Sequence, residues 1–520
     1  MTGNVSLRFA DLFAVFLYAV GILWLGWWTQ KRIKGTEGFF LAGRSMPSWA
    51  VGMSVLATAI SSITFLAYPG SSYTGNWSRL VPGLMLPFAT AIGVYFFVVF
   101  YRRTMFVSAY EYFERRYGNW GRSYASALFS LGSLYRMGMV LYLMSLPIKV
   151  LTGWSGMTVI IFAGAIVTIY TVMGGLQGVI WTDVVQGTLL LVGGLVTIAI
   201  IFLEVPGGPA AVISQAYAAG KFNLVVSFDW TLARDTFWLF ALMGLVGNIQ
   251  EQATDQTKVQ RYQAAKTDRD AIKAALYVLL CIPTWIMFMF IGSCLWVYYR
   301  AFPGILPEGI RADYVYPHFI LTQTPPFIGG IIIVAVLSAA MATDSTMNGS
   351  ASVILEDFYK RHFVKGKDDR HYLFVARLIT WTLGALMMVV AWGFSLLNAD
   401  TILDIGFFIG AIMAGGLGGF FLLGFLFKRA NAQGALVGLL SGIAVILWLT
   451  LGHLGAIPER YAPDFHPFIT GVLGNVVVFV VGLAASYFFP APDQEKISGM
   501  TWWTREKTRD TRGVALTVNP

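Results

Sequence analysis

Long apolar runs separated by short polar segments dominate the sequence. About 20 mostly apolar residues are enough to cross a bilayer as a helix, and many of the runs reach that length. The runs are continuous rather than alternating, which excludes a transmembrane β-barrel. The pattern therefore predicts an all-α polytopic membrane protein with about 13 transmembrane helices. The predicted spans are 7–28, 48–72, 80–101, 123–151, 156–173, 179–203, 235–255, 272–299, 326–355, 372–394, 401–427, 433–451 and 467–489.

Composition agrees with this pattern. The 520 residues are 57% hydrophobic and 12% charged, whereas soluble proteins are roughly 45–50% apolar and about 25% charged. So few charges cannot cover the surface of a soluble protein of this length, which excludes soluble enzymes. No phosphate-binding loop is found in the sequence, which argues against ATP-driven transport, and we expect no enzymatic activity.

The basic residues lie mainly in alternate loops. Most of the 36 Lys and Arg residues fall within 31–44, 102–122, 258–273, 360–377, 428–429 and 496–512. Basic loops stay on the cytoplasmic side, so we expect the N-terminus outside and the C-terminus inside. This topology accounts for the net charge of +9. We therefore expect the protein to be surrounded by the lipid bilayer, in the plasma membrane, and to bind no nucleic acid.

Two spans carry polar, helix-breaking residues at membrane depth. The second span has Ser61 and Thr64 followed by Pro69 and Gly70, and the seventh has a polar stretch at 247–252. Interrupted helices at corresponding positions of two five-span repeats mark the substrate site in many transporters. We expect both helices to be broken and the substrate to bind between them.

Arg136 and Asp183 are charged residues within predicted spans, where a charge costs at least about 2.5–3.5 kcal/mol and needs an explanation. Arg136 is in the middle of its span, where it could clamp an anionic substrate group or pair with a structural partner. Asp183 lies near one end of its span, where it could serve an ion path or cap the helix.

Residues that could offer hydroxyl or backbone carbonyl oxygens share one face of the ninth span and one face of the second. Residues spaced at i, i+3, i+4 and i+7 lie on the same side of a helix. Na⁺ prefers oxygen ligands, which hydroxyls and the free carbonyls of a broken helix supply. The two faces together predict a Na⁺ site between these spans. The residues concerned are Ala339, Ala342, Thr343 and Thr346, and Ala57, Ile60, Ser61 and Thr64.

With these motifs, the sequence resembles the sodium:solute symporter family over almost its whole length. The resemblance is carried by residues 54–65, 178–187 and 259–262 and by the ninth span. It implies a leucine-transporter-like fold made of inverted five-helix repeats. The implied organisation is a leading helix in 1–30, repeats at 47–203 and 235–427, two trailing helices in 433–489 and a cytoplasmic tail at 490–520.

The resemblance also implies a principal Na⁺ site, with Na⁺ as the coupling ion. It would use the carbonyls of Ala57, Ile60 and Ala339 with side chains of the ninth span. Ala342 and Thr343 stand where the family usually has two hydroxyl residues, so Thr343 alone offers a side-chain oxygen. Some members, the sialic acid transporters among them, have a second Na⁺ site. The resemblance leaves such a site open here, at Asp183, Ser345 and Thr346.

For the substrate, the resemblance points in two directions. Arg136 matches the arginine that holds the substrate carboxylate in sialic acid transporters, whereas the stretch 254–256 is similar to the sodium/glucose cotransporters. We expect a Na⁺-coupled symporter that imports a small polar organic solute, with a slight preference for a carboxylated, sialic-acid-like one. A Na⁺/sugar symporter and a non-transporting solute sensor remain alternatives. The candidate substrate ligands are Ser61, Thr64, Arg136, Asp255 and Gln256.

Overall fold

The chain is a bundle of helices. The computed structural model describes residues 9–60, 63–104, 106–341, 343–396, 402–413 and 415–505. Within these residues there is no β-strand, only an isolated bridge between Met46 and Ala265. Ten helices there are long and apolar enough to cross a membrane, or 11 if one bent pair is a single span. The all-α membrane fold is confirmed, while 13 spans and their orientation stay predictions.

The helices follow the apolar runs of the sequence. The first half of the chain has α1 (Phe9–Gln30), α2 (Gly35–Leu41), α3 (Ser48–Ala59), α4 (Tyr68–Thr74), α5 (Val81–Leu84), α6 (Leu86–Gly93), α7 (Val99–Thr104), α8 (Glu111–Tyr117), α9 (Asn119–Thr152), α10 (Gly156–Glu204), α11 (Gly208–Ala218) and α12 (Phe237–Thr254). The second half has α13 (Gln256–Ala264), α14 (Asp268–Leu276), α15 (Cys281–Ala301), α16 (Ala312–Gln323), α17 (Ile328–Met341), α18 (Thr343–Val353), α19 (Asp369–Ser395), α20 (Ile402–Met413), α21 (Leu417–Leu426), α22 (Ala432–His453), α23 (Thr470–Ser486) and α24 (Gln494–Ile497).

Two of the 13 predicted spans share the 49-residue α10. Its path changes at Gly175, where φ is 50° and ψ is −158°. A Cβ at this position would lie 2.7 Å from the carbonyl oxygen of Phe39, so the close approach of α2 also requires glycine. The break separates the predicted spans 156–173 and 179–203. The predicted span 235–255 is α12, which is not among the ten apolar candidates.

The second predicted span is broken, as expected. Its two helical parts are bent by 60°, because α3 ends at Ala59 and Ile60 is extended. A π-helical turn, Ile63–Ala67, leads into α4. The ninth predicted span corresponds to one apolar candidate, Ile328–Phe363, which contains α17, α18 and a π-helix, Ile354–Phe363; Ala342 lies outside the described residues.

The expected break at 247–252 is wrong, because α12 is helical from Phe237 to Thr254. Its polar side chains bond to neighbouring helices instead of interrupting their own backbone. Asn248 donates to the carbonyl of Pro82 (3.1 Å) and Gln252 to Thr90 (3.3 Å). The chain leaves the helix at Asp255, which accepts a hydrogen bond from the backbone of Thr257 and caps α13.

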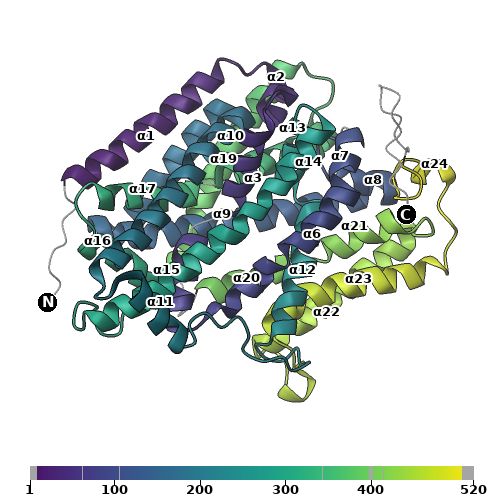
Figure 1. The fold of residues 1–520 in the computed structure, drawn as a ribbon. Helices are drawn as coiled ribbons and strands as arrows, with labels where there is room; N and C mark the ends of the chain where they lie inside the picture. The colour runs from purple at the N-terminus through teal and green to yellow at the C-terminus, as the bar shows by residue number, and fades with distance from the viewer. Residues whose placement is uncertain are drawn as a thin grey trace.

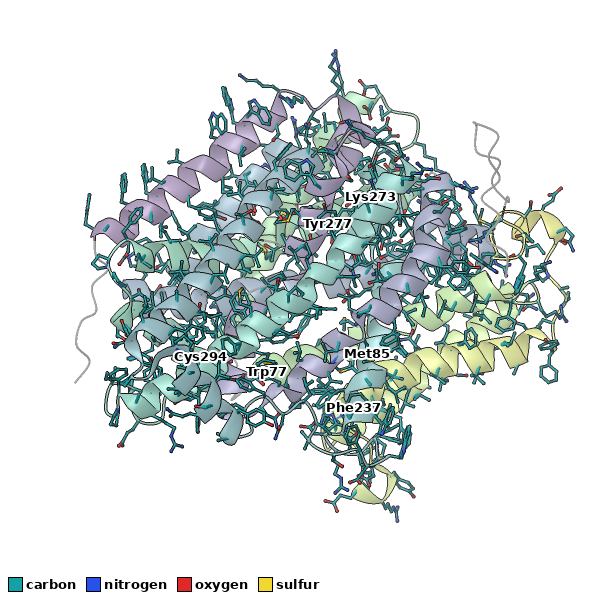
Figure 2. The ribbon with its side chains drawn as sticks, viewed as in Figure 1. Trp77, Met85, Phe237, Lys273, Tyr277 and Cys294 are labelled. Atoms are coloured by element: carbon teal, nitrogen blue, oxygen red, sulfur yellow. The ribbon has the colours of Figure 1, made fainter. Side chains whose placement is uncertain are left out.

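Figure 1 shows α1 and the pair α22–α23 along opposite edges of the bundle. Helices α22 and α23 pack closely through small residues, since a Cβ on Gly438 would lie 2.5 Å from the carbonyl oxygen of Val478. In Figure 2, Lys273 and Cys294 lie toward opposite ends of the path formed by α14 and α15, and Phe237 lies near the end marked by Cys294. Lys273 marks the end of the bundle that the basic loops predict to be cytoplasmic.

Candidate functional site

A buried polar cluster surrounds Asp183 on α10. Asp183 is 0% exposed, and its Oδ2 accepts hydrogen bonds from Ser54 of α3 (2.5 Å) and Ser345 of α18 (3.1 Å). Arg261 of α13 lies 3.1 Å from the same oxygen. The carboxylate thus contacts side chains of three other helices and no backbone N–H of its own helix. Helix capping, the alternative role for Asp183, is not what the structure shows.

Arg261 connects the same elements from the other side. It is only 1% exposed. Its Nε donates to Ser54 (2.9 Å), its Nη2 to Ser345 (2.5 Å) and its Nη1 to the carbonyl of Thr257 (2.8 Å). Arg261 belongs to the motif 259–262 and, from the sequence, is one of the charges of the loop 258–273. That its helix, α13, is buried along its whole length could not be read from the charge pattern.

A second carboxylate, Asp344, lies beside this pair. It is 0% exposed and accepts hydrogen bonds from the hydroxyls of Tyr170 (2.9 Å) and Thr182 (3.1 Å) and from the backbone of Ser345 (2.5 Å). None of these three donors carries a positive charge. Ser345 connects the two acids, because its hydroxyl bonds to Asp183 and its N–H to Asp344.

The cluster has more acidic than basic side chains. Asp183, Asp344 and Arg261 together carry one net negative charge when both acids are ionised. In addition, Oδ1 of Asp183 is buried without a hydrogen-bond partner among the described residues. A buried charge is costly unless it is paired. The carboxylate and hydroxyl oxygens of the cluster, with the negative charge of its acids, therefore suit a small cation as ligands.

The end of α3 lies next to the start of α18. Thr58 donates to the hydroxyl of Ser345 (3.2 Å), and Thr343, which begins α18, is 4% exposed. Because α3 stops at Ala59, its last carbonyls point beyond the helix end, where the helix dipole is negative. The N–H of Ile60 bonds to the carbonyl of Ala57 (3.2 Å), which leaves that oxygen a second lone pair.

Of the predicted principal Na⁺ site, the structure brings the end of α3 into contact with α18, through Thr58 and Ser345. Ala57 and Ile60 lie at the end of α3, and Ala339 lies in the last turn of α17. Ser61 and Ala342 lie outside the described residues. Of the predicted second-site residues, Ser345 contacts Asp183, while Thr346 is buried nearby on α18.

Arg136 reaches the broken helix from α9. Its Nη2 donates to the carbonyl of Thr58 (3.3 Å), which is its one hydrogen bond within the described residues. Glu251 of α12 interacts electrostatically with Arg136 and pairs with Lys258 (2.7 Å). A guanidinium has five N–H donors, so Arg136 keeps most of its donors for an anionic partner.

The other predicted substrate ligands differ in their availability. Thr64 is 4% exposed in the turn after α3. Asp255 caps α13, and Gln256 bonds to the backbone of Ala109 (2.7 Å) and of Val107 (2.8 Å). The polar atoms of Asp255 and Gln256 are therefore used within the protein, and we do not retain these two residues as substrate ligands.

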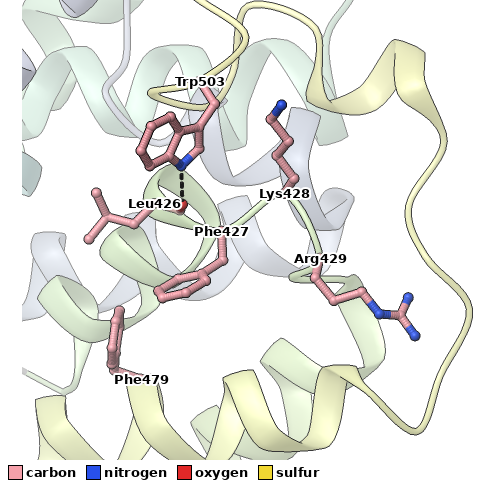
Figure 3. Close-up of a pocket in the computed structure, with 6 residues that line it drawn as sticks. All are labelled: Leu426, Phe427, Lys428, Arg429, Phe479 and Trp503. Atoms are coloured by element: carbon pink, nitrogen blue, oxygen red, sulfur yellow. Dashed lines mark hydrogen bonds between the residues drawn. The ribbon is translucent and has the colours of Figure 1, made fainter.

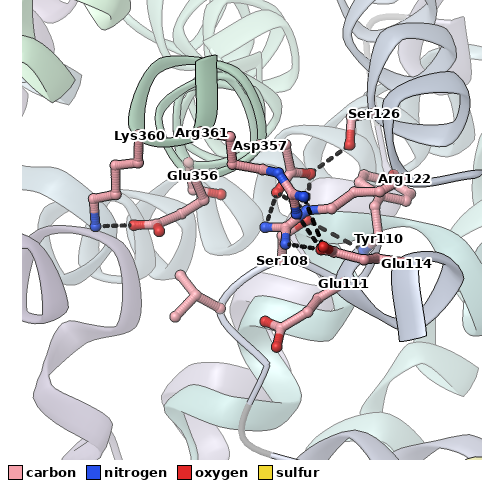
Figure 4. A network of polar contacts seen from close by, with 12 residues as sticks. Ser108, Tyr110, Glu111, Glu114, Arg122, Ser126, Glu356, Asp357, Lys360 and Arg361 are labelled. Carbon is pink, nitrogen blue, oxygen red and sulfur yellow. Dashed lines mark hydrogen bonds and ion pairs between the residues drawn. The ribbon is translucent and has the colours of Figure 1, made fainter. Parts of the chain in front are cut away.

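A network of ion pairs joins α8 and α9 to the π-helix after α18 (Figure 4). Asp357 accepts hydrogen bonds from Arg122 (2.8 Å) and Ser108 (2.7 Å). Glu114 pairs with Arg122 (2.7 Å) and with Arg361. The hydrogen bond from Arg361 and the charge of Arg122 lower the pKa of Glu114. From the sequence, Arg122 and Arg361 could be interpreted only as topology signals, because their acidic partners lie on other elements.

A broken membrane helix such as α3, next to a buried cluster of acids and hydroxyls, is typical of cation-coupled membrane transporters. The sequence model of the sodium:solute symporter family matches residues 39–442. The chain therefore belongs to this family and is a Na⁺-coupled membrane transporter.

Sequence relatives support the same assignment. The chain is 31% identical over 480 residues, 92% of either chain, to the sodium/sialic acid symporter NanT of Aliivibrio fischeri. It is 33% identical to the sodium/sialic acid symporter SiaT of Proteus mirabilis, over 93% of this chain and 96% of the relative. It is 28% identical to the human sodium-coupled monocarboxylate transporter 1, over 82% of this chain and 71% of the relative.

Solved structures agree in the fold. A Na⁺-coupled sialic acid symporter, in a substrate-bound outward-open state described with a novel Na⁺ site, matches with a TM-score of 0.86 and 31% identity over 94% of this chain and 99% of the other. The nucleobase-cation-symport-1 transporter Mhp1 matches with a TM-score of 0.54 and 16% identity, over 89% of this chain and 97% of the other. That second likeness concerns the fold alone.

Proposed function

We propose that the protein imports a carboxylated, sialic-acid-like sugar together with Na⁺ across the plasma membrane. The observation that carries the proposal is Arg136, a cation inside a predicted span whose guanidinium reaches the end of the broken α3 through Thr58. A guanidinium in such a place can hold a carboxylate with two parallel hydrogen bonds. Two relatives above 30% identity are named as sialic acid symporters, which supports the same substrate.

The proposed topology has 13 spans with the N-terminus outside and the C-terminus inside. A leading helix in 1–30 precedes five-helix repeats at 47–203 and 235–427, two trailing helices within 433–489 and a tail at 490–520. In this arrangement α3 opens the first repeat and α12 the second. The substrate site lies between them.

The first Na⁺ binds, in this proposal, where α3 ends beside α17 and α18. Its ligands are the carbonyls of Ala57, Ile60 and Ala339 and the hydroxyl of Thr343, next to Ala342. Bound Na⁺ connects the end of α3 to α18 and so stabilises the arrangement that is open to the outside. Ser61 and Thr64 follow directly along the chain and place the substrate beside the ion.

A second Na⁺ binds in the cluster around Asp183, with Ser345 and Thr346. Arg261 by itself would neutralise Asp183. Asp344 supplies the further negative charge that makes a cation favourable there. Each Na⁺ that enters with the solute gains about 2.3 kcal/mol per 100 mV of membrane potential, which drives accumulation.

Uptake into proteoliposomes tests this function. The purified protein should accumulate radiolabelled N-acetylneuraminate when Na⁺ is higher outside, and collapse of the gradient with a Na⁺ ionophore should release it. Glucose and a short monocarboxylate serve as competing solutes. The variant Arg136→Lys, which keeps the charge but loses the planar fork, is the matched control and should take up the acid poorly.

The possible results separate the alternatives. Accumulation of glucose but not of any acid would contradict the carboxylated substrate and favour a Na⁺/sugar symporter. Binding of the acid in solution without any uptake would favour a solute sensor. Uptake at the same rate with and without a Na⁺ gradient would refute Na⁺-coupled symport.

A further inference from the structure

An apolar groove lies where α21 meets the C-terminal segment, well away from the ion cluster. Its volume is about 630 Å³, and it is lined by Leu426, Phe427, Lys428, Arg429, Phe479 and Trp503. Figure 3 shows the rings of Phe427 and Phe479 on one side of it and the side chains of Lys428 and Arg429 on the other. The groove therefore has an apolar part and a cationic part.

The walls of the groove are held by hydrogen bonds. The indole Nε1 of Trp503 donates to the carbonyl of Leu426 (2.7 Å), and the backbone N–H of Trp502 donates to that of Phe425 (2.8 Å). These bonds fix the segment after α24 over the end of α21. The rings of Phe427 and Phe479 lie 5.6 Å apart and form the floor. Trp503 is 64% exposed, so its ring faces the surroundings while its only donor is already used.

The cationic side has unused hydrogen-bond donors. Lys428 is exposed and has no hydrogen bond or ion pair within the described residues. Arg429 donates through Nη2 to the carbonyls of Tyr487 (3.3 Å) and Phe489 (2.8 Å), which fixes its guanidinium. Its Nη1 is buried without a partner in the described part of the chain. None of the lining residues is acidic. An anion is therefore the group that this side would accept.

A second cavity provides an internal comparison. It has about 460 Å³ and lies between α1, α10 and α17, with lining residues such as Leu17, Leu189 and Val334. No charged residue lines it. It offers room for an acyl chain but nothing for a headgroup, so the charge at Lys428 and Arg429 distinguishes the first groove.

We propose that the groove between α21, α23 and the C-terminal segment is a binding site for an anionic phospholipid. One acyl chain lies on Phe427 and Phe479, the phosphate contacts the exposed Lys428 next to the charge of Arg429, and Trp503 lies at the level of the headgroup. Tryptophan is enriched at that level of the bilayer, and basic pockets at the ends of membrane helices bind anionic headgroups. The proposal does not depend on the transported solute.

Lipid binding to the purified full-length protein tests this site. After delipidation in detergent, native mass spectrometry measures binding of phosphatidylglycerol and phosphatidylcholine with the same acyl chains. Phosphatidylglycerol should bind the wild type more tightly. Lys428→Gln should reduce that preference about fivefold, the effect expected for one basic residue near an anionic lipid. Trp503→Ala should weaken the binding of both lipids.

Controls separate the site from general charge and from free phosphate. Lys149→Gln removes an exposed lysine at the end of α9 and should leave the preference unchanged. Glycerol 3-phosphate, which has the headgroup chemistry without acyl chains, should not displace phosphatidylglycerol at equal concentration. Equal binding of both lipids by the wild type, an unchanged preference in Lys428→Gln, or displacement by glycerol 3-phosphate would overturn the proposal.

Discussion

Replacement of Arg261 by methionine should strongly destabilise the protein, because it leaves buried acids without their cation. Methionine has a similar length but no charge. Asp183 would lose the ion pair at 3.1 Å, and Ser54 and Ser345 would lose hydrogen bonds from the same guanidinium. Removal of one partner of a buried pair costs about 3–5 kcal/mol. Both acids are 0% exposed, so water cannot screen them and the upper part of that range applies.

The variant should also become more dependent on Na⁺. When both acids are ionised, the cluster carries one net negative charge with Arg261 and two in Arg261→Met, so a bound cation stabilises the variant more than the wild type. Adding Asp183→Asn to Arg261→Met removes the unpaired charge. That double variant should recover at least about 2 kcal/mol relative to the sum of the single changes, a coupling typical of residues in contact.

The assay is unfolding of the purified protein in detergent over a series of Na⁺ concentrations, with K⁺ keeping the ionic strength constant. Arg122→Met is the matched control, because Arg122 also pairs with a buried acid, Asp357, but in the network of Figure 4. It should destabilise the protein without changing the response to Na⁺. If Na⁺ stabilises Arg261→Met and Arg122→Met equally, cation binding in the cluster is refuted. If the losses of stability in Arg261→Met and Asp183→Asn simply add up in the double variant, the pairing of Arg261 with Asp183 is refuted.

Other variants test the remaining residues. Thr343→Ala should raise the Na⁺ concentration for half-maximal uptake and change substrate affinity at saturating Na⁺ much less; an unchanged Na⁺ dependence would remove Thr343 from the principal site. Arg136→Ala should weaken binding of the acid by about 2–5 kcal/mol, measured by calorimetry. A substrate amide, which lacks the carboxylate, should already bind the wild type poorly, and its affinity should fall little further in Arg136→Ala. Asp344→Asn should lower the number of Na⁺ ions per solute, measured from reversal potentials, and an unchanged ratio would exclude its charge from ion binding. The lowered pKa of Glu114 means that its ion pairs stabilise the fold above about pH 4.5 and that this stabilisation is lost as pH falls further; Glu114→Gln should therefore flatten the acid side of a thermal stability profile.

The membrane helices could be predicted because the bilayer imposes them. A segment in hydrocarbon must satisfy its own backbone hydrogen bonds, so apolar length alone located nearly every long helix. The details depend on neighbours that a single sequence does not reveal. Helix α12 stays continuous because Asn248 and Gln252 find partners on other elements. The break in the second span was expected from its polar and helix-breaking residues, but it lies at Ile60, whereas Pro69 and Gly70 are part of α4; a proline in the first turn of a helix does not interrupt it.

The site was partly predictable for a similar reason. Asp183 and Arg136 were found because a charge inside an apolar run needs an explanation. Arg261 was missed, since a cation near a loop looks like a topology signal whether it stays in water or folds back into the bundle. Only the structure shows that α13 is buried and that Arg261 is 1% exposed. The same ambiguity concealed Arg122 and its pairing with Asp357.

The charges of the cluster explain how a small ion could control a large rearrangement. Asp183 comes from α10 and its partner Ser54 from α3, both in the first proposed repeat, while Arg261 on α13 and Asp344 on α18 belong to the second. Without a bound cation, the extra negative charge disfavours the close packing of these four helices. In the proposed second site, a Na⁺ ion would remove that penalty only while the helices stay together, since its proposed oxygen ligands come from both proposed repeats. The free energy of Na⁺ binding is thereby linked to the relative position of the two halves, which is the coupling that symport requires.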